Sequence, residues 1–204
     1  MLKTVCAGLV GLVVWQSQAL AQAQGGPAIG QPAPELSLPD SRGTTHSLAE
    51  FQGKWVVLEW LNRECPYVRK HYNSGNMQRL QREYTAKGVI WLSIVSSAPG
   101  KQGYVTGPEA DQFAQERGSA ATAILLDPSG AVGHRYDARN TPQMFVIDPT
   151  GVLRYDGAID NRPTPRLSDI EGATNYLAAA LDEAMAGRPV TTPRTQPYGC
   201  TVKY

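Results

Sequence analysis

The sequence predicts an α/β fold with a central mixed β-sheet flanked by helices, an N-terminal hairpin and an extended C-terminal tail. Nearly continuous apolar runs at Lys54–Trp60 and Val89–Val95 are typical of strands buried on both faces of a sheet. Segments with helical spacing alternate with these strands, and two short apolar runs around Pro149–Gly151 predict a closing antiparallel hairpin. The chain has 204 residues, of which 42% are hydrophobic, so it can bury one sizeable core.

The first 21 residues are predicted to be a signal peptide and not part of the fold. Lys3 precedes an apolar run, Val5–Trp15, that is too short to span a bilayer, and the small-x-small site Ala19–Ala21 follows. We expect cleavage near Ala21, export to the periplasm and no stable insertion into the membrane. A lipid anchor on Cys6 is disfavoured because no lipoprotein box precedes that cysteine.

Residues 22–33 are small, polar and punctuated by proline, so they are predicted to be a linker. The domain then covers residues 34–204, with a tail at 187–204. At its start, Leu36 and Leu38 alternate with polar residues, Asp40–Gly43 supplies a turn, and Thr44–Leu48 follows. This pattern predicts a small hairpin.

The helical stretches are placed by the spacing of apolar residues and by their stop signals. One runs from Pro66 to Lys87, with a weak point at Ser74–Asn76, and Gly88 ends it. After the second strand and a glycine-rich loop at 96–107, another helix begins near Pro108.

The remaining elements follow in order along the chain. A third strand at 122–126 and a helical turn at 132–136 lead to the hairpin strands 143–148 and 152–156. A last helix is predicted over 169–186, because apolar residues recur on one stripe there. The tail beyond it is rich in proline and glycine, which predicts an irregular path.

Cys65 is the strongest candidate for chemistry, because it follows a strand and Pro66 places it at the start of a helix. Unpaired backbone N–H groups and the helix dipole stabilise a thiolate there, and the thiolate is the nucleophile. Glu64 opposes that effect, whereas three nearby basic side chains favour it: Arg63, Arg69 and Lys70. The alternative interpretation is a buried, inert cysteine.

Three segments carry a resemblance to a known family. Val56–Val68 is similar to the strand and active-site segment of periplasmic thioredoxins, Asn140–Asp148 to their cis-proline loop, and Pro197–Tyr204 to the tail of a peroxiredoxin-like redoxin group. From Gly30 to the end, the chain resembles the thioredoxin-like superfamily, and within it the redoxins grouped with alkyl hydroperoxide reductase and thiol-specific antioxidant proteins.

The resemblance implies a thioredoxin-like fold in which Cys65 is the attacking cysteine. Val68 stands where a second, resolving cysteine would be, so the local dithiol is absent. The loop at Thr141 and Pro142 is expected to face Cys65 through a cis peptide bond and to hold the substrate chain, and Pro66, next to Cys65 in the sequence, is a further candidate for substrate binding.

Three positions depart from the peroxidase pattern of this family. Asn62 and Leu58 stand where peroxiredoxins have a threonine and a proline that shape the peroxide pocket. Their second arginine falls near Pro142, with Arg139 as the closest substitute. The amide of Asn62 can hydrogen-bond where the threonine hydroxyl would. Asn62 and Arg139 are therefore kept as candidates for substrate binding.

Other chemistries find less support in the sequence. His71 lies six residues after Cys65, on a different side of the helix, which disfavours it as a base for that thiol. A copper-carrier pair would need a cysteine at Arg69, so no metal site is expected, and no bound cofactor is required. The net charge is +1 and the basic residues are scattered, so no electrostatic footprint for nucleic acid is present.

The sequence therefore predicts an exported thiol–disulfide oxidoreductase of the redoxin type, in which Cys65 attacks a disulfide or a peroxide and a thiol protein donates electrons. The signal peptide takes Cys6 with it, so Cys200 is the remaining intramolecular candidate for the resolving thiol. Cys200 could instead pair between chains or stay free. Two other hypotheses are a thiol peroxidase that reduces hydroperoxides, with an antioxidant role, and a non-catalytic redoxin-fold binding module whose Cys65 and Cys200 form a structural disulfide.

Overall fold

The computed structural model describes residues 26–204. The predicted signal peptide and residues 22–25 of the predicted linker lie outside the described residues. Within the described part of the chain, no helix is both long enough and apolar enough to cross a membrane.

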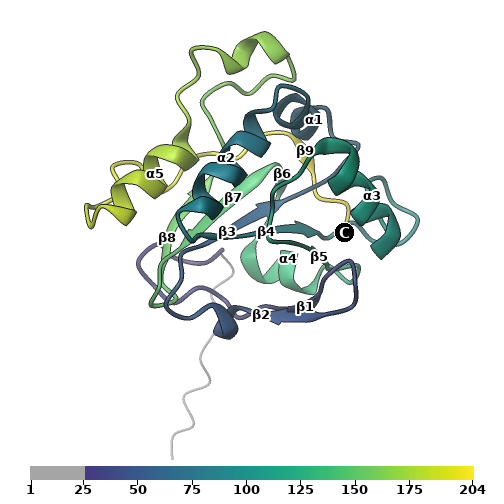
Figure 1. The fold of residues 1–204 in the computed structure, drawn as a ribbon, viewed down its shortest axis with the longest axis horizontal. Helices are drawn as coiled ribbons and strands as arrows, with labels where there is room; N and C mark the ends of the chain where they lie inside the picture. The colour runs from purple at the N-terminus through teal and green to yellow at the C-terminus, as the bar shows by residue number, and fades with distance from the viewer. Residues whose placement is uncertain (1–25) are drawn as a thin grey trace, which may run out of the picture.

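A five-stranded mixed sheet forms the centre of the molecule, as the sequence predicted (Figure 1). Its order is β5 (Ala123–Leu126), β4 (Ile90–Val95), β3 (Val56–Trp60), β7 (Gln143–Ile147) and β8 (Leu153–Gly157). The first three strands are parallel to one another, whereas β7 runs antiparallel to both β3 and β8.

Strand β3 is the middle strand, which explains its nearly continuous apolar sequence. Leu58 lies opposite Leu92 of β4 on one side and Phe145 of β7 on the other. All five residues of β3 are buried. A strand covered on both faces and paired on both edges leaves no solvent-facing side to carry polar residues.

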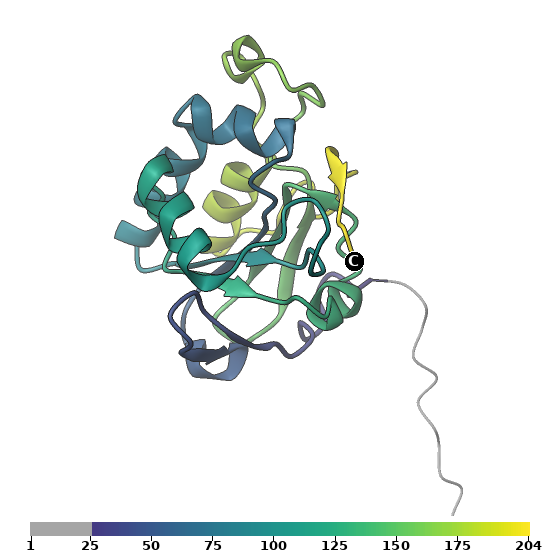
Figure 2. The same ribbon diagram turned by 90° about the vertical axis from the view of Figure 1, so that its right-hand side faces the viewer.

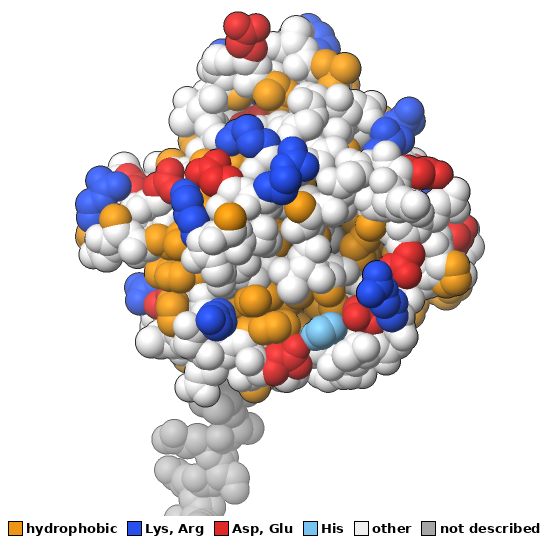
Figure 3. Space-filling model, viewed as in Figure 1, with side chains coloured by type: hydrophobic (Ala, Val, Ile, Leu, Met, Phe, Trp, Pro, Cys, Tyr) orange, Lys and Arg blue, Asp and Glu red, His pale blue; other side chains and the backbone are white. Residues whose placement is uncertain are grey.

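Helices and the small hairpin cover the two faces of the sheet in separate layers (Figures 1 and 2). One face carries α1 (Pro66–Asn73), α2 (Asn76–Ala86), α3 (Gly107–Arg117) and α5 (Tyr176–Met185). The other carries the hairpin of β1 (Ser37–Pro39) and β2 (Thr45–Ser47), the 3-10 turn η1 (Leu48–Phe51) and α4 (Ala131–Tyr136). On the surface shown in Figure 3, acidic and basic side chains are interspersed.

The predicted helix from Pro66 to Lys87 is two helices, divided at the expected weak point. Helix α1 ends at Asn73, and Gly75 takes a left-handed conformation with φ of +74° before α2 begins. Glycine adopts that conformation without the steric cost that a Cβ would add.

The predicted start of the last helix, at residue 169, is wrong. Helix α5 begins at Tyr176, because the side chain of Asn175 accepts a hydrogen bond from the Ala178 amide and caps it there. The preceding segment contains a separate 3-10 turn, η2 (Leu167–Ile170), within a connection between β8 and α5 that projects from the body of the molecule (Figures 1 and 2).

The tail is less irregular than the sequence predicted. Cys200 and Thr201 form a short strand, β9, that pairs antiparallel with β6 (Asn140–Thr141). In that register, Cys200 lies directly opposite Thr141. The end of the chain therefore lies against the loop that precedes β7.

Candidate active site

Cys65 caps helix α1, at the point where the chain turns from strand β3 into the helix. Its amide donates to the Asn62 carbonyl (3.1 Å), and its own carbonyl accepts from the Arg69 amide (2.9 Å). Its φ and ψ angles of −67° and 124° are those of a helix N-cap, and Pro66 occupies the first turn. The Cys65 side chain is buried.

The loop at Thr141 and Pro142 lies against Cys65, and its peptide bond is cis, as expected. The Cys65 Sγ donates a hydrogen bond to the Thr141 carbonyl oxygen at 3.1 Å. This contact joins residues that are 76 positions apart in the chain.

Strand β9 brings Cys200 to the same place. The Thr141 hydroxyl donates to the Cys200 carbonyl (3.4 Å), and the Asn140 side-chain amide donates to the Gly199 carbonyl (3.0 Å). Cys200 also lies close enough to Cys65 for each thiol to shift the pKa of the other. Both cysteines are free thiols, with Cys65 buried and Cys200 half-buried.

The pKa values of the two thiols are shifted in opposite directions. Burial raises the pKa of Cys65, but the Cys200 thiol, the Thr141 side chain and the Val68 and Cys200 amides lower it by more, so the pKa lies below the usual value. Burial and the neighbouring Cys65 raise the pKa of Cys200 to about 12. Of the two thiols, Cys65 is therefore the one that loses its proton first.

The basic side chains that lie near Cys65 in the sequence are not what lowers its pKa. Arg63 pairs with Glu109 at 3.3 Å, and Lys70 Nζ donates to the Arg162 carbonyl at 2.8 Å. Hydrogen bonds, and not these cations, lower the pKa of Cys65.

Asn62 joins the Cys65 turn to the glycine-rich loop. Its side-chain oxygen accepts from the Glu64 amide (2.9 Å), while its nitrogen donates to the Gln102 carbonyl (3.3 Å). A Cβ on Gly103 would lie 2.3 Å from the Asn62 side chain, and the φ of Gly103 is +84°. Only glycine fits this approach, which packs the loop against the turn.

The structure does not bring the Arg139 guanidinium to Cys65. That group pairs with the Asp137 carboxylate at 2.5 Å and is largely exposed. The Arg139 backbone takes part instead, because its carbonyl accepts a hydrogen bond from the Val202 amide (3.0 Å) and so helps to hold the tail.

A buried polar cluster behind α1 was not predicted. Tyr198, two residues before Cys200, donates to Asp160 Oδ1 at 2.5 Å and lies 3.2 Å from His71 Nε2. Asp160 also lies 3.6 Å from Lys70 Nζ. Burial lowers the pKa of His71 to about 4, so the imidazole is neutral near pH 7. No sequence pattern links these positions. The one signal that could have pointed to the cluster is a tyrosine two residues before Cys200.

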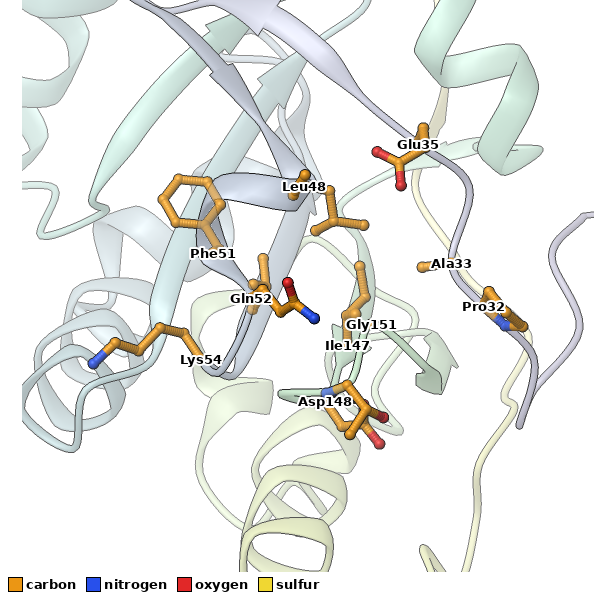
Figure 4. Close-up of a pocket in the computed structure, with 13 residues that line it drawn as sticks. Pro32, Ala33, Glu35, Leu48, Phe51, Gln52, Lys54, Ile147, Asp148 and Gly151 are labelled. Atoms are coloured by element: carbon orange, nitrogen blue, oxygen red, sulfur yellow. Dashed lines mark hydrogen bonds between the residues drawn. The ribbon is translucent and has the colours of Figure 1, made fainter.

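Two hollows lie at opposite ends of β3. One, of about 550 Å³, borders the Cys65 turn and is lined mostly by polar side chains, including Arg63 of the turn, Arg69 of α1 and Gln112 of α3. The other, of about 250 Å³, lies at the start of β3, where Leu48 and Phe51 face Ile147 and the N-terminal segment (Figure 4). None of the residues predicted for catalysis or substrate binding lines this second hollow.

Comparison with known proteins places this geometry in a family. Residues 29–156 match the AhpC/TSA family. Thiol:disulfide interchange protein DsbE of Allochromatium vinosum is 27% identical over 140 residues, covering 66% of this chain and 70% of that protein. Thiol-disulfide oxidoreductase ResA of Geobacillus kaustophilus is 28% identical over 134 residues, covering 62% and 67%.

The structural comparison extends over more of the chain. The crystal structure of a hypothetical protein from Sinorhizobium meliloti has a TM-score of 0.76 and 25% sequence identity, covering 88% of this chain and 96% of that one. Solved structures of thioredoxin-like proteins share the fold as well. With a thioredoxin-like fold and a match over more than half of its length, this chain belongs to the AhpC/TSA family.

Proposed function

We propose that this protein is an exported thiol–disulfide oxidoreductase in which Cys65 is the nucleophile and Cys200 the resolving thiol. The observation that carries the proposal is the pairing of β9 with β6, which sets Cys200 opposite Thr141, the residue whose carbonyl accepts a hydrogen bond from Cys65 at the start of α1. The relatives named as a thiol:disulfide interchange protein and a thiol-disulfide oxidoreductase support this class of reaction. Export rests on the predicted signal peptide.

The first step is attack by the Cys65 thiolate on one sulfur of a substrate disulfide, R–S–S–R′. A bond forms between Cys65 Sγ and the sulfur of R, the S–S bond of the substrate breaks, and R′S⁻ leaves with the electron pair and takes up a proton. The groups that lower the pKa of Cys65 increase the share of the reactive thiolate form.

The second step releases the substrate. Once Cys65 is in the mixed disulfide, its negative charge no longer raises the pKa of Cys200, so Cys200 loses its proton more readily. Cys200 then attacks Cys65 Sγ, and RS⁻ leaves. The substrate has gained two electrons and the enzyme holds a Cys65–Cys200 disulfide, which a dithiol donor protein reduces to restart the cycle.

The substrate-binding edge in this proposal consists of Asn62, Pro66, Thr141 and Pro142 around Cys65. Asn62 fixes the turn, and Pro66 is exposed beside the nucleophile. Thr141 offers the backbone groups that β9 occupies here. Arg139 contributes its carbonyl, and not its guanidinium, to this edge.

A second candidate, reduction of hydroperoxides, is favoured by one observation. Cys65 is fully buried beside the tail, which suits a small oxidant. A peroxide ROOH would convert the thiolate to a sulfenic acid and leave as ROH; condensation with Cys200 would then give the same disulfide and water. Against it, Asn62 and Arg139 bind other protein groups where a peroxide pocket would need them.

Stopped-flow oxidation of the reduced protein distinguishes these reactions. We expect a small disulfide to oxidise the wild type faster than hydrogen peroxide does, Cys200→Ser to accumulate a mixed disulfide on Cys65, and Cys65→Ser to be inert. Faster oxidation by peroxide would favour the peroxidase. Normal turnover by Cys65→Ser would favour a binding module with a structural disulfide.

A further inference from the structure

The pairing that holds Cys200 beside Cys65 is too short to fix its own position. Strand β9 has two residues, and so does its partner β6. Even a complete two-stranded hairpin is only marginally stable in water. The register of Cys200 against Thr141 therefore depends on anchors outside the pairing.

The Tyr198 side chain supplies such an anchor. Its ring packs against Tyr67, with 5.8 Å between centroids, and Lys70 Nζ lies 5.6 Å from the ring. Its hydroxyl donates to Asp160, whose side chain is 2% exposed and also accepts from the Arg162 amide (2.8 Å). The hydroxyl thus binds a carboxylate that the fold has already buried and fixed.

The hydrogen bonds around Tyr198 run in one direction. Arg79 donates to Asn76 Oδ1 (3.1 Å), so the Asn76 amide nitrogen faces His71 Nδ1 and donates to it at 2.9 Å. A neutral His71 then carries its proton on Nε2, which donates to the Tyr198 oxygen. Among the described residues, Asp160 is therefore the acceptor for the Tyr198 proton, which sets the orientation of the hydroxyl.

The link from Tyr198 to Cys200 is a single glycine. Gly199 has a φ of +117°, and a Cβ there would lie 2.1 Å from the Thr141 carbonyl oxygen. Two residues span at most about 7 Å. Fixing Tyr198 therefore restricts Cys200 to the immediate neighbourhood of Thr141 and Cys65.

We propose that Tyr198 is a positioning residue of the thiol pair: by binding Asp160 and His71, it holds Cys200 opposite Thr141 and beside Cys65, which Cys200 later attacks. This inference rests on the proposed roles of the two cysteines. Asp160, His71 and Lys70 thus form a docking site for the tail of the same chain.

Equilibrium with glutathione measures this positioning directly. In the reaction of the reduced protein with GSSG, the Cys65–Cys200 bond forms, two molecules of GSH are released, and two electrons pass from the protein to glutathione. The equilibrium constant is the effective concentration of the two thiols for each other. We expect Tyr198→Phe to lower it about tenfold or more, the loss that one hydrogen bond to a buried carboxylate implies.

A second measurement separates positioning from mere stability. The pH profile for alkylation of Cys65 in Cys200-containing protein reports whether the Cys200 thiol still donates to it, and we expect Tyr198→Phe to move that profile to higher pH. Gly199→Ala, which leaves the cluster intact, should do the same. Tyr67→Phe keeps the ring contact and removes a hydroxyl with no hydrogen bond in the described structure, so it should match the wild type.

The outcomes distinguish this inference from the proposed function. An unchanged effective concentration and alkylation profile in folded Tyr198→Phe would overturn the positioning role, even if the protein were less stable. An equal loss in Tyr67→Phe would also overturn it. Failure of the wild type to form the Cys65–Cys200 bond would instead contradict the proposed function.

Discussion

Replacing Cys200 by alanine should raise the pKa of Cys65. Burial raises the pKa of Cys65, and the neighbouring Cys200 thiol makes the largest contribution that lowers it. A hydrogen bond to a charged group contributes about 1.5–3 kcal/mol, and 1.36 kcal/mol corresponds to about one pKa unit. The loss alone would therefore raise the pKa by about one to two units.

Part of that loss will be recovered by water. Cys200 is half-buried, so removing its sulfur admits solvent that can itself hydrogen-bond to the thiolate. We therefore expect a rise of about one unit, the lower end of the range. The amides of Val68 and residue 200 and the Thr141 hydroxyl remain in the variant, which prevents a larger change.

Thiolate absorbance in the ultraviolet, followed against pH, provides the measurement. When expressed from residue 22, Cys200→Ala contains Cys65 as its single cysteine, so the titration belongs to one group. Cys200→Ser is the matched control, because its hydroxyl still donates a hydrogen bond, and its pKa should fall between those of the wild type and the alanine variant. A pKa in Cys200→Ala equal to or below the wild-type value would refute the reasoning.

Three further predictions follow from the surroundings of the thiol pair. Burial lowers the pKa of His71 to about 4 from 6.5, so the unfolded chain binds the proton more tightly than the folded chain does. The free energy of unfolding, measured with urea, should therefore fall by up to about 3 kcal/mol as the pH drops from 6.5 to about 4, and His71→Gln should remove this fall. Asn62→Ala should lose about 1–3 kcal/mol of stability, because the loop loses its hydrogen bond to the turn. Trypsin should then cleave faster at Lys101 in that loop, and an unchanged cleavage rate would contradict this. Arg139→Ala should leave the rates of Cys65 with disulfide and peroxide unchanged, and a large fall in the peroxide rate would restore a peroxide-pocket role.

The elements that the sequence predicts well are those with a strong local signal. The apolar run at Lys54–Trp60 has a single good solution, a central strand, and β3 is that strand. The cysteine followed by Pro66 marks a helix start for reasons of backbone geometry alone, and Cys65 caps α1. The break near Gly75 likewise follows from its conformational freedom.

The features that the sequence did not predict depend on contacts between distant segments. The sequence allows the last helix to begin either near Asp169 or after Asn175. The fold uses Asn175, which also forms a backbone bridge with the distant Asp160. Thr201 and Val202 favour a strand, but Pro197 and Gly199 interrupt the pattern, so the place of β9 is set by Tyr198 and the loop at Thr141. Such pairings have no local pattern from which to be inferred.

Mass spectrometry of the mature protein after one equivalent of oxidant tests the central claim most directly. Reduced protein is treated with a small disulfide, remaining thiols are blocked, and peptides are analysed without reduction. The position of Cys200 opposite Thr141, whose carbonyl accepts from Cys65, predicts a peptide that links Cys65 to Cys200 within one chain. A Cys65 adduct that persists while Cys200 stays free, or linkage exclusively between chains, would contradict the account.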